Sequence, residues 1–242
     1  MIRKLFLFGV VVAALTFAAG GQSDPGGSTT QQVDAQARRS GAVVLPPSAR
    51  HQGRSLAAWQ RAYFEWASLI PTDGQQPHPG LAEGDVDCSY AQHGHVWFLE
   101  LGGVERRCSI APGKALYVPV NFWACLPEAD QVPFPECEAQ GDPYLEGVTS
   151  TLTLDGRRTD LSAWRAETGR FTLELADQNV WEAFFGFADL GPSTPFSSDG
   201  MGAIVLLGPG QHSVVSGVTF DFDGDGTPET FETSYDITVG LR

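Results

Sequence analysis

The stretch "HSVVSGVTFDFDGDGTPETFETSYDITV", residues 212–239, contains two runs in which apolar and polar side chains alternate. In the first run Val218, Phe220 and Phe222 fall on one face, while a threonine and two aspartates fall on the other. The second run places five residues on one face: Phe231, Thr233, Tyr235, Ile237 and Val239. Because side chains of a strand alternate between its two faces, both runs read as strands with one buried face. The stretch therefore predicts a β-hairpin that packs on a core.

Strand-like runs continue through the rest of the chain. They are "HVWFLEL" (95–101), "KALYVPVNFWA" (114–124), "VTSTLTL" (148–154), "FTLELA" (171–176), "VWEAFFGFA" (180–188) and "AIVLLG" (203–208). Turn residues stand at Gly102-Gly103, Asp155-Gly156 and Pro209-Gly210. About eight to ten short strands with such turns indicate a mainly β chain, folded as a β-sandwich or a jelly-roll-like single domain.

One amphipathic helix is expected near the start of this domain. Ser55 is a suitable N-cap, and an apolar stripe then recurs at three- and four-residue spacing through Leu56, Trp59, Tyr63, Trp66 and Ile70. A stripe of this kind usually marks the side of a helix that faces a core, so we expect the helix to pack across a sheet.

The N-terminal region resembles an export signal followed by a linker. Arg3 and Lys4 precede an apolar run from Leu5 to Ala19, which is shorter than the ~20 residues of a membrane span. We therefore predict a signal peptide over residues 1–20, a flexible linker over 21–48 that is rich in Gly, Ser, Gln and Pro, and a β-rich domain over 49–242. An uncleaved anchor is the alternative. The prediction is an exported chain, located in the periplasm, at the cell surface or outside the cell, with no membrane span after cleavage.

Four cysteines fit an oxidising compartment. Cys88, Cys108, Cys125 and Cys137 allow three pairings, of which the two short loops, Cys88–Cys108 and Cys125–Cys137, close most easily. Each bridge of this kind stabilises a fold by ~3 kcal/mol through the unfolded state. A zinc site is the rival interpretation, but the sequence has no C-x-x-C spacing.

The charge of the chain excludes one class of partner. The sequence has 15 Lys and Arg against 29 Asp and Glu, a formal net charge of −14. A field of this sign repels nucleic acid and attracts cations. We therefore expect no nucleic-acid partner.

The turn of the opening hairpin carries the clearest chemical signal. Asp221, Asp223, Asp225 and Gly226 follow a D-x-D-x-D-G spacing, which suits the oxygen ligands of calcium, and Glu232 completes an EF-hand pattern. Strand-like flanks and Pro228 argue against an EF-hand.

The stretch "DFDGDGTPE" resembles instead the calcium loops of integrin-type FG-GAP repeats. That resemblance implies Asp221, Asp223, Asp225, the Thr227 carbonyl and Glu229 as ligands of a structural calcium ion. A polar hairpin tip that only protects a sheet edge is the alternative.

A second polar stretch, from His78 to His95, contains further candidate ligands: His78, Glu83, Asp85, Asp87, His93 and His95. His93 and His95 share a face if they lie on a strand, but no third ligand follows from the spacing. The chain has no G-x-S-x-G, no H-E-x-x-H and no phosphate-binding glycine loop.

Several short motifs occur in a recognisable order. Trp59, Trp66, His78-Pro79, Cys88, "GHVWFLEL", Gly102-Gly103, the "RRC" ending at Cys108 and "APGKALYVPVN" follow one another, with "GPGQHSVV" and "TSYDITV" matching more loosely. This order resembles a group of uncharacterised exported bacterial proteins. The resemblance implies export and a single domain, and it brings no activity.

These patterns predict an exported, non-catalytic binding or structural module with a calcium-stabilised C-terminal hairpin and a carbohydrate or surface-protein partner. The alternative is a secreted hydrolase, with carbohydrate as a candidate substrate and a site in the His78–His95 stretch.

Overall fold

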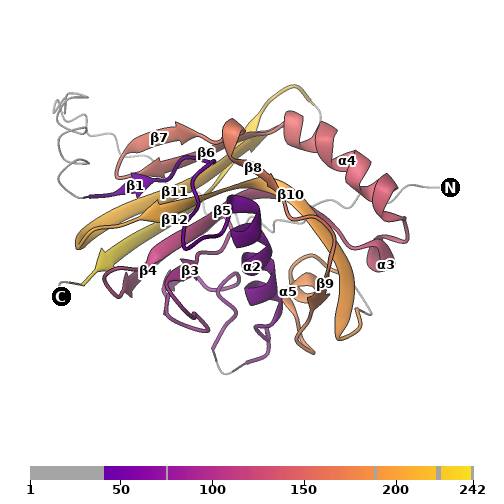
Figure 1. The fold of residues 1–242 in the computed structure, drawn as a ribbon, viewed down its shortest axis with the longest axis horizontal. Helices are drawn as coiled ribbons and strands as arrows, with labels where there is room; N and C mark the ends of the chain where they lie inside the picture. Colours follow the sequence, from indigo (N-terminus) through magenta and orange to yellow (C-terminus); the bar gives the residue numbers. More distant parts are fainter. Residues whose placement is uncertain (1–40, 75, 188–189, 222–224, 241–242) are drawn as a thin grey trace, which may run out of the picture.

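The computed structural model describes residues 41–74, 76–187, 190–221 and 225–240. Its main feature is a pair of stacked β-sheets (Figure 1). The predicted mainly β, sandwich-like architecture is confirmed. The predicted signal peptide and most of the predicted linker lie outside the described residues.

The first sheet has the strand order β1 (Val43–Val44), β10 (Ser193–Leu206), β5 (Ala115–Cys125) and β3 (Val96–Phe98). Two further strands also pair with β10: β9 (Phe171–Glu174) with its start and β8 (Arg165–Glu167) with its middle. Strand β1 lies within the predicted linker, so the fold begins earlier than residue 49.

The second sheet has the order β2 (Gly84–Asp85), β4 (Glu105–Ile110), β12 (Glu229–Val239), β11 (Gly210–Phe220), β6 (Thr149–Leu154) and β7 (Arg157–Asp160). The predicted hairpin is present: β11 and β12 pair antiparallel from Gly210↔Val239 to Phe220↔Glu229. In β12, Thr233, Tyr235, Ile237 and Val239 are buried and the residues between them are more exposed, as the period of two predicts.

The main core fills the space between the two sheets. Apolar side chains from both sheets form it, among them Leu116, Val118, Val120, Leu152, Ala203, Val205, Val214, Tyr235 and Ile237. The opposite face of the first sheet is also buried, because helix α2 (Leu56–Ser68) packs against it. Tyr63 and Phe64 of α2 contact the rings of Tyr117 and Phe196. The Ser55 side chain accepts a hydrogen bond from the Ala58 amide and caps the helix as predicted.

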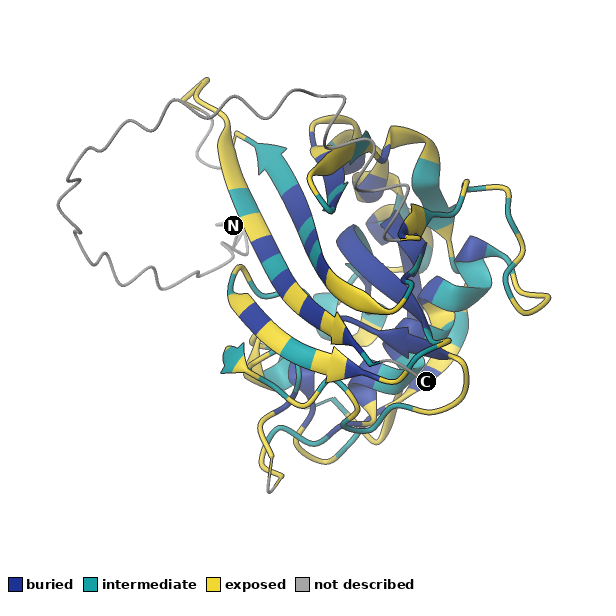
Figure 2. Cartoon of the chain, turned by 90° about the vertical axis from the view of Figure 1, so that its left-hand side faces the viewer, coloured by how far each residue is buried: buried dark blue, intermediate teal, exposed yellow. Residues whose placement is uncertain are grey.

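The opposite face of the second sheet faces outward. Along β4 and β12 buried and exposed residues alternate, which gives the striped strands of Figure 2. The outward side chains of Arg107, Asp236 and Thr238 are exposed. The molecule therefore has three layers, a helix and two sheets, with one sheet face left open.

Both favoured disulfides are confirmed: Cys88 bonds Cys108, and Cys125 bonds Cys137. The first joins the loop after β2 to β4, and the second joins the end of β5 to helix α4 (Phe134–Glu146). No cysteine is free among the described residues. The part of the chain that the structure describes also contains no helix long and apolar enough to cross a membrane.

The prediction of a single helix is incomplete. Besides α2 the described chain forms α3 (Pro127–Asp130), α4, α5 (Val180–Ala183) and the 3-10 turn η1 (Ser162–Trp164). The strand predicted over residues 180–188 is wrong, because the Asn179 side chain accepts from the amides of Trp181 and Glu182 and starts a helical turn. Helix α4 contains Gly141 and Pro143, which disfavour a helix. It forms because a disulfide and a close packing contact between Gly141 and Trp123 hold it on β5.

Strand β10 begins ten residues before the predicted apolar run, at Ser193. The residues before that run, 193–202, are mostly polar and include Gly200 and Gly202, so they resemble a loop. A Cβ atom at Gly200 would lie 2.3 Å from the Asn121 carbonyl oxygen, so glycine allows β10 to approach β5 closely. Strands β4, β7 and β8 were also not anticipated, because each is short and polar.

The predicted turns are present but differ in kind. Asp155 and Gly156 have φ of 50° and 79° and connect β6 to β7 in a two-residue hairpin, as expected for an Asp-Gly pair. Gly102-Gly103 connects β3 to β4 and Pro209-Gly210 connects β10 to β11, so both of these turns pass from one sheet to the other.

Candidate functional site

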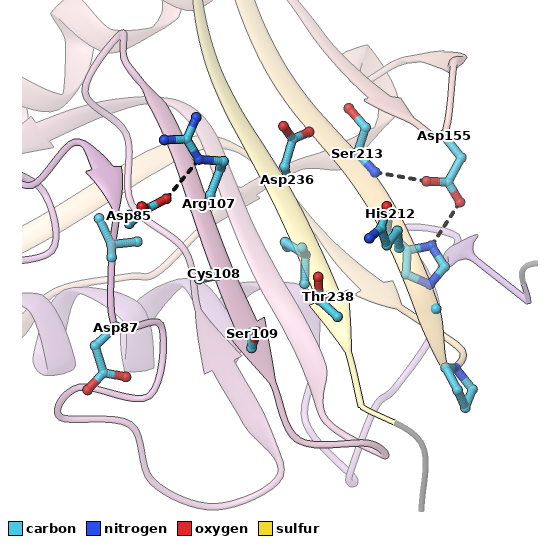
Figure 3. Close-up of a pocket in the computed structure, with 15 residues that line it drawn as sticks. Asp85, Asp87, Arg107, Cys108, Ser109, Asp155, His212, Ser213, Asp236 and Thr238 are labelled. Atoms are coloured by element: carbon cyan, nitrogen blue, oxygen red, sulfur yellow. Dashed lines mark hydrogen bonds and ion pairs between the residues drawn. The ribbon is translucent and has the colours of Figure 1, made fainter.

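A broad groove of about 1310 Å³ lies on the open face of the second sheet (Figure 3). Neighbouring strands place outward side chains in register across it. Asp236 of β12 stands opposite Arg107 of β4 and Ser213 of β11, and Arg107 stands opposite Asp85 of β2. Hydroxyl and amide side chains form the next row, namely Ser109, Thr238 and Gln211. The groove is thus lined by short polar groups.

Carboxylates dominate the charge of this groove. Its one arginine, Arg107, donates from Nε to Asp85 Oδ1 at 2.7 Å, and this bond raises the pKa of the guanidinium. Asp87 accepts from the amide and the hydroxyl of Ser89. Asp155 and Asp236 bring the lining carboxylates to four. The groove therefore favours neutral or cationic ligands over anionic ones.

An Asp–His pair stands at one edge of the groove. His212 Nδ1 lies 2.9 Å from Asp155 Oδ2, and Asp155 Oδ1 accepts from the Ser213 amide at 2.9 Å. His212 Nε2 lies 2.8 Å from the Gly208 carbonyl oxygen. Because a carbonyl oxygen can only accept, Nε2 carries a hydrogen and has no lone pair to offer a substrate. The pair therefore joins the β6–β7 turn to the β10–β11 connection and does not provide a general base.

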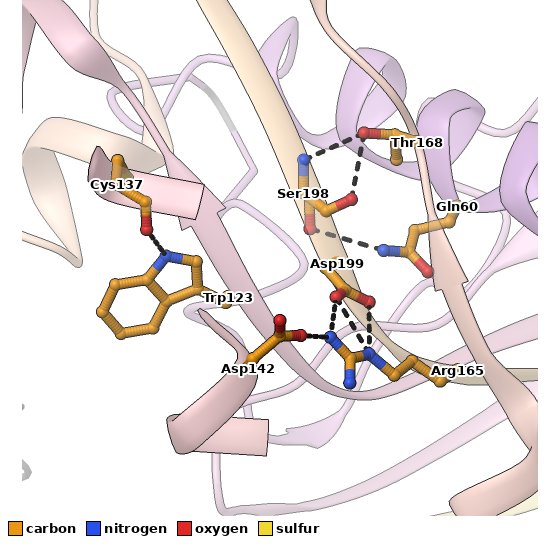
Figure 4. A network of polar contacts seen from close by, with 8 residues as sticks. All are labelled: Gln60, Trp123, Cys137, Asp142, Arg165, Thr168, Ser198 and Asp199. Carbon is orange, nitrogen blue, oxygen red and sulfur yellow. Dashed lines mark hydrogen bonds and ion pairs between the residues drawn. The ribbon is translucent and has the colours of Figure 1, made fainter. Parts of the chain in front are cut away.

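A smaller groove of about 270 Å³ lies between α4 and the first half of β10. Arg170 lines this groove, and Arg165 bonds two of the carboxylates that line it. Arg165 bonds both Asp142 of α4 and Asp199 of β10, and Arg170 bonds Glu138 of α4 (Figure 4 shows the Arg165 network). These hydrogen bonds raise the pKa of Arg165, and the bond from Arg170 lowers the pKa of Glu138. Both guanidinium groups already have carboxylate partners. We therefore interpret these ion pairs as contacts that hold α4 on the sheet.

The candidate ligands of the His78–His95 stretch do not come together. His78 is fully buried, whereas His93 and His95 are exposed in the loop before β3. Asp85 and Asp87 point into the groove of the second sheet, and Glu83 is exposed. Among the described residues no group of three or more His, Cys, Asp or Glu is placed to hold a metal ion.

The predicted calcium loop is described only in part, because Asp223 lies outside the described residues. Asp221 Oδ2 accepts from the Gly226 amide at 2.9 Å, and Asp225 Oδ1 accepts from the Thr227 amide at 2.7 Å. Glu229 opens β12 opposite Phe220, whereas Glu232 stands opposite Gly217, farther from the tip. Position along the strand thus favours Glu229 over Glu232 as the closing ligand. The calcium site stays a prediction.

A buried polar network was not anticipated from the sequence. Glu100, just after β3, accepts from the Tyr63 hydroxyl at 2.6 Å, and the fully buried Arg106 of β4 lies beside it. Tyr235 of β12 and His78 complete the cluster. Four of these five residues fall in the ordered motifs: His78 in "HP", Glu100 in "GHVWFLEL", Arg106 in "RRC" and Tyr235 in "TSYDITV". The order of the motifs was visible in the sequence, but their convergence was not.

Comparisons with known proteins add no family. No family model and no curated protein sequence matches the chain. Among solved structures, one match is the solution structure of amebosin, with 9% identity, a TM-score of 0.16, and coverage of 65% of this chain and 99% of that one. Another is the Plasmodium falciparum protein Pf12p, with 10% identity, a TM-score of 0.17, and coverage of 57% and 43%. Similarity at this level carries no functional argument.

Proposed function

We propose that this protein is an exported, non-catalytic binding module that uses the groove on the open face of its second sheet. One observation carries the proposal: of the two outer sheet faces, one is covered by a helix, and the other presents a groove of about 1310 Å³ lined by short polar side chains. A chain that forms two disulfides fits an oxidising compartment, which supports export.

The side chains of the groove suit a neutral glycan. Carboxylate, hydroxyl and amide groups at Asp236, Ser213 and Gln211 can accept from and donate to sugar hydroxyls. The excess of carboxylates disfavours a phosphorylated or sulfated ligand. Among the described residues, no Phe, Tyr or Trp side chain lines this groove to stack on a sugar ring, so the groove would bind a single sugar unit weakly.

Calcium has a structural role in this proposal. Asp221, Asp223, Asp225, the Thr227 carbonyl and Glu229 would hold the ion at the tip of β11 and β12. These two strands form the middle of the groove floor. The groove residues of these strands lie at the opposite end of the hairpin, near Gly210 and Thr238, so the ion would stabilise the shared strands without touching the ligand.

The hydrolase alternative gains no support from the described residues. The residues suggested for its site, such as His78, His93 and Asp87, are separated into a core, a loop and a groove.

Binding of the full chain to a panel of neutral and acidic polysaccharides tests the proposal. Asp236→Arg places a cation in the middle of the groove and should weaken binding to neutral glycan at least tenfold, which is about 1.4 kcal/mol. Glu128→Arg makes the same charge change at an exposed position of α3 and should leave binding unchanged. Equal losses in both variants, or no binding of any neutral glycan by the unmodified chain, would overturn the proposal.

A further inference from the structure

Glu100 is a buried acid that the proposed binding function does not use. It follows β3 and is 7% exposed. Helix α2, the loop at residues 78–82, strand β4 and strand β12 all contribute groups around it: Tyr63, His78, Gly80, Arg106 and Tyr235. Its position is where the covering helix meets the ends of both sheets.

The Glu100 carboxyl group receives little hydrogen bonding. Oε2 accepts from the Tyr63 hydroxyl at 2.6 Å. Oε1 is buried and has no hydrogen-bond partner within the described chain. A buried carboxylate that is well stabilised accepts two or three hydrogen bonds. The ionised form of Glu100 accepts fewer, so its surroundings stabilise it only weakly.

Arg106 does not hydrogen-bond this carboxyl group, although it lies close by. Its Nε donates to the Ala82 carbonyl, Nη1 donates to the Glu100 carbonyl and the Tyr235 hydroxyl, and Nη2 donates to the carbonyls of Gly80 and Leu101. A guanidinium has five N–H groups, and these five acceptors take all of them. The positive charge is therefore held by backbone oxygens.

The other polar neighbours of the Glu100 carboxyl group form their hydrogen bonds with other groups. His78 Nδ1 accepts from the Gly80 amide at 3.0 Å, so the ring hydrogen is on Nε2, which faces the Ala67 carbonyl. The Tyr235 hydroxyl donates to the Glu100 carbonyl and accepts from the Glu100 amide. Tyr117 contacts the Tyr63 ring from β5. Within the part of the chain that the structure describes, Tyr63 alone donates a hydrogen bond to the Glu100 carboxyl group.

We propose that Glu100 and Tyr63 form a proton-controlled latch: Glu100 is a neutral carboxylic acid in the folded protein, and its ionisation loosens α2 from the two sheets. This inference is independent of the proposed glycan binding. It concerns the covered side of the molecule and assigns a conformational role to Glu100, which lies in the "GHVWFLEL" motif.

The electrostatics agree with this geometry. Burial raises the pKa of Glu100, and the opposing influences of His78, Tyr63 and Arg106 do not cancel that rise. Burial also raises the pKa of Tyr63 well above its ordinary value, so the phenol stays protonated. A raised acid pKa means that the folded state holds a proton that the unfolded state releases. The stability it contributes is complete below the ordinary glutamate pKa and is lost as pH rises through the raised value.

Urea unfolding of the full chain from about pH 4 to about pH 8 tests the latch, because one released proton changes the unfolding constant up to tenfold per pH unit. The unfolding constant of the unmodified chain should rise more steeply with pH than that of Glu100→Gln, which cannot ionise. Glu65→Gln is the matched control, since Glu65 lies on the same helix with a side chain that is 43% exposed, and it should follow the unmodified chain. Parallel profiles for the unmodified chain and Glu100→Gln would overturn the proposal.

A second measurement uses the unmodified chain alone, so it does not depend on the folding of a variant. Carbon-13 NMR of the glutamate carboxyl groups should show one resonance in the folded protein that titrates above all others. Amide exchange, corrected for its intrinsic pH dependence, should show protection in α2 falling with rising pH by about tenfold more than in β11 and β12. Ordinary titration of every glutamate, or a uniform loss of protection, would refute the latch.

Discussion

The two outer faces of the sandwich differ although the sheets share one core. On the first sheet, the residues of β5 from Ala115 to Asn121 are all buried, because the second sheet covers one face and α2 the other. On the second sheet, β12 alternates from Thr233 to Val239 between buried residues and residues that are half-buried or exposed. A continuous apolar run therefore marks a strand covered on both sides, and alternation marks a strand with one open face. The open face is where a ligand can reach the sheet.

The largest expected effect is a difference in unfolding free energy between substitutions on the covered face and on the open face. Phe64 is 1% exposed and packs against Phe122 and Phe196, both with ring centroids 4.9 Å away. Phe64→Ala should lower the free energy of unfolding by about 3–5 kcal/mol, because it leaves a cavity under the helix. Val215→Ala, on the open face of β11, should cost less than about 1 kcal/mol in the same urea experiment. Similar costs would show that the open face is also covered.

Removing each disulfide in turn tests whether the stability of both sheets depends on a covalent crosslink. Cys125–Cys137 closes a separation of 12 residues beside the first sheet, and Cys88–Cys108 closes 20 residues beside the second. Replacing either pair by serine should lower stability by about 3 kcal/mol. Unfolding of the two double variants measures this. A large loss for only one pair would show that one sheet depends on its crosslink and the other does not.

Calcium is expected to act on the second sheet alone. At a hundredfold excess over its dissociation constant, one bound ion should stabilise the fold by about 2.7 kcal/mol, measured as a shift in thermal unfolding with and without chelator. Asp223→Ala and Asp225→Ala should abolish the shift, and Asp87→Ala in the groove should keep it. A calcium response that survives in Asp225→Ala would contradict the ligand set.

The smallest expected effects on stability come from replacing arginines that form ion pairs near the surface. Arg165, whose side chain is 30% exposed, holds α4 beside the first sheet. Arg165→Ala should cost on the order of 1 kcal/mol after solvent screening. Arg107, paired on the open face with a side chain that is 60% exposed, should be replaceable by alanine with little change in stability. Equal costs would mean that the Asp85–Arg107 pair is structural as well.

Much of the fold was predictable because local patterns report local structure. The period of two gave the faces of β11 and β12, the three- and four-residue spacing gave α2, and short loops identified both disulfides. Helix α5 and the first half of β10 were missed. In these places a side-chain cap at Asn179 and a close approach at Gly200 override the apparent propensity.

The candidate sites were harder to predict. Short separation along the chain brought His78, His93 and His95 together only on paper, since the fold buries the first and exposes the others. The groove depends on strands from four separate parts of the chain, so no local pattern marks it. The one feature of the sequence that points to the groove is the alternation in β12, which places polar residues on the outward face.

The sequence by itself determined the faces of β11 and β12, several of the longer strands and the covering helix α2, and it favoured the cysteine pairing that the structure shows, because these depend on periodicity and on short loops. The tertiary structure alone decided which sheet face stays open. It also decided that the Glu100 carboxyl group is buried away from water. Glu100 lies 37 residues from Tyr63 and 135 from Tyr235 along the chain. Burial is a property of the groups that surround a residue in space, and here those groups come from distant parts of the sequence.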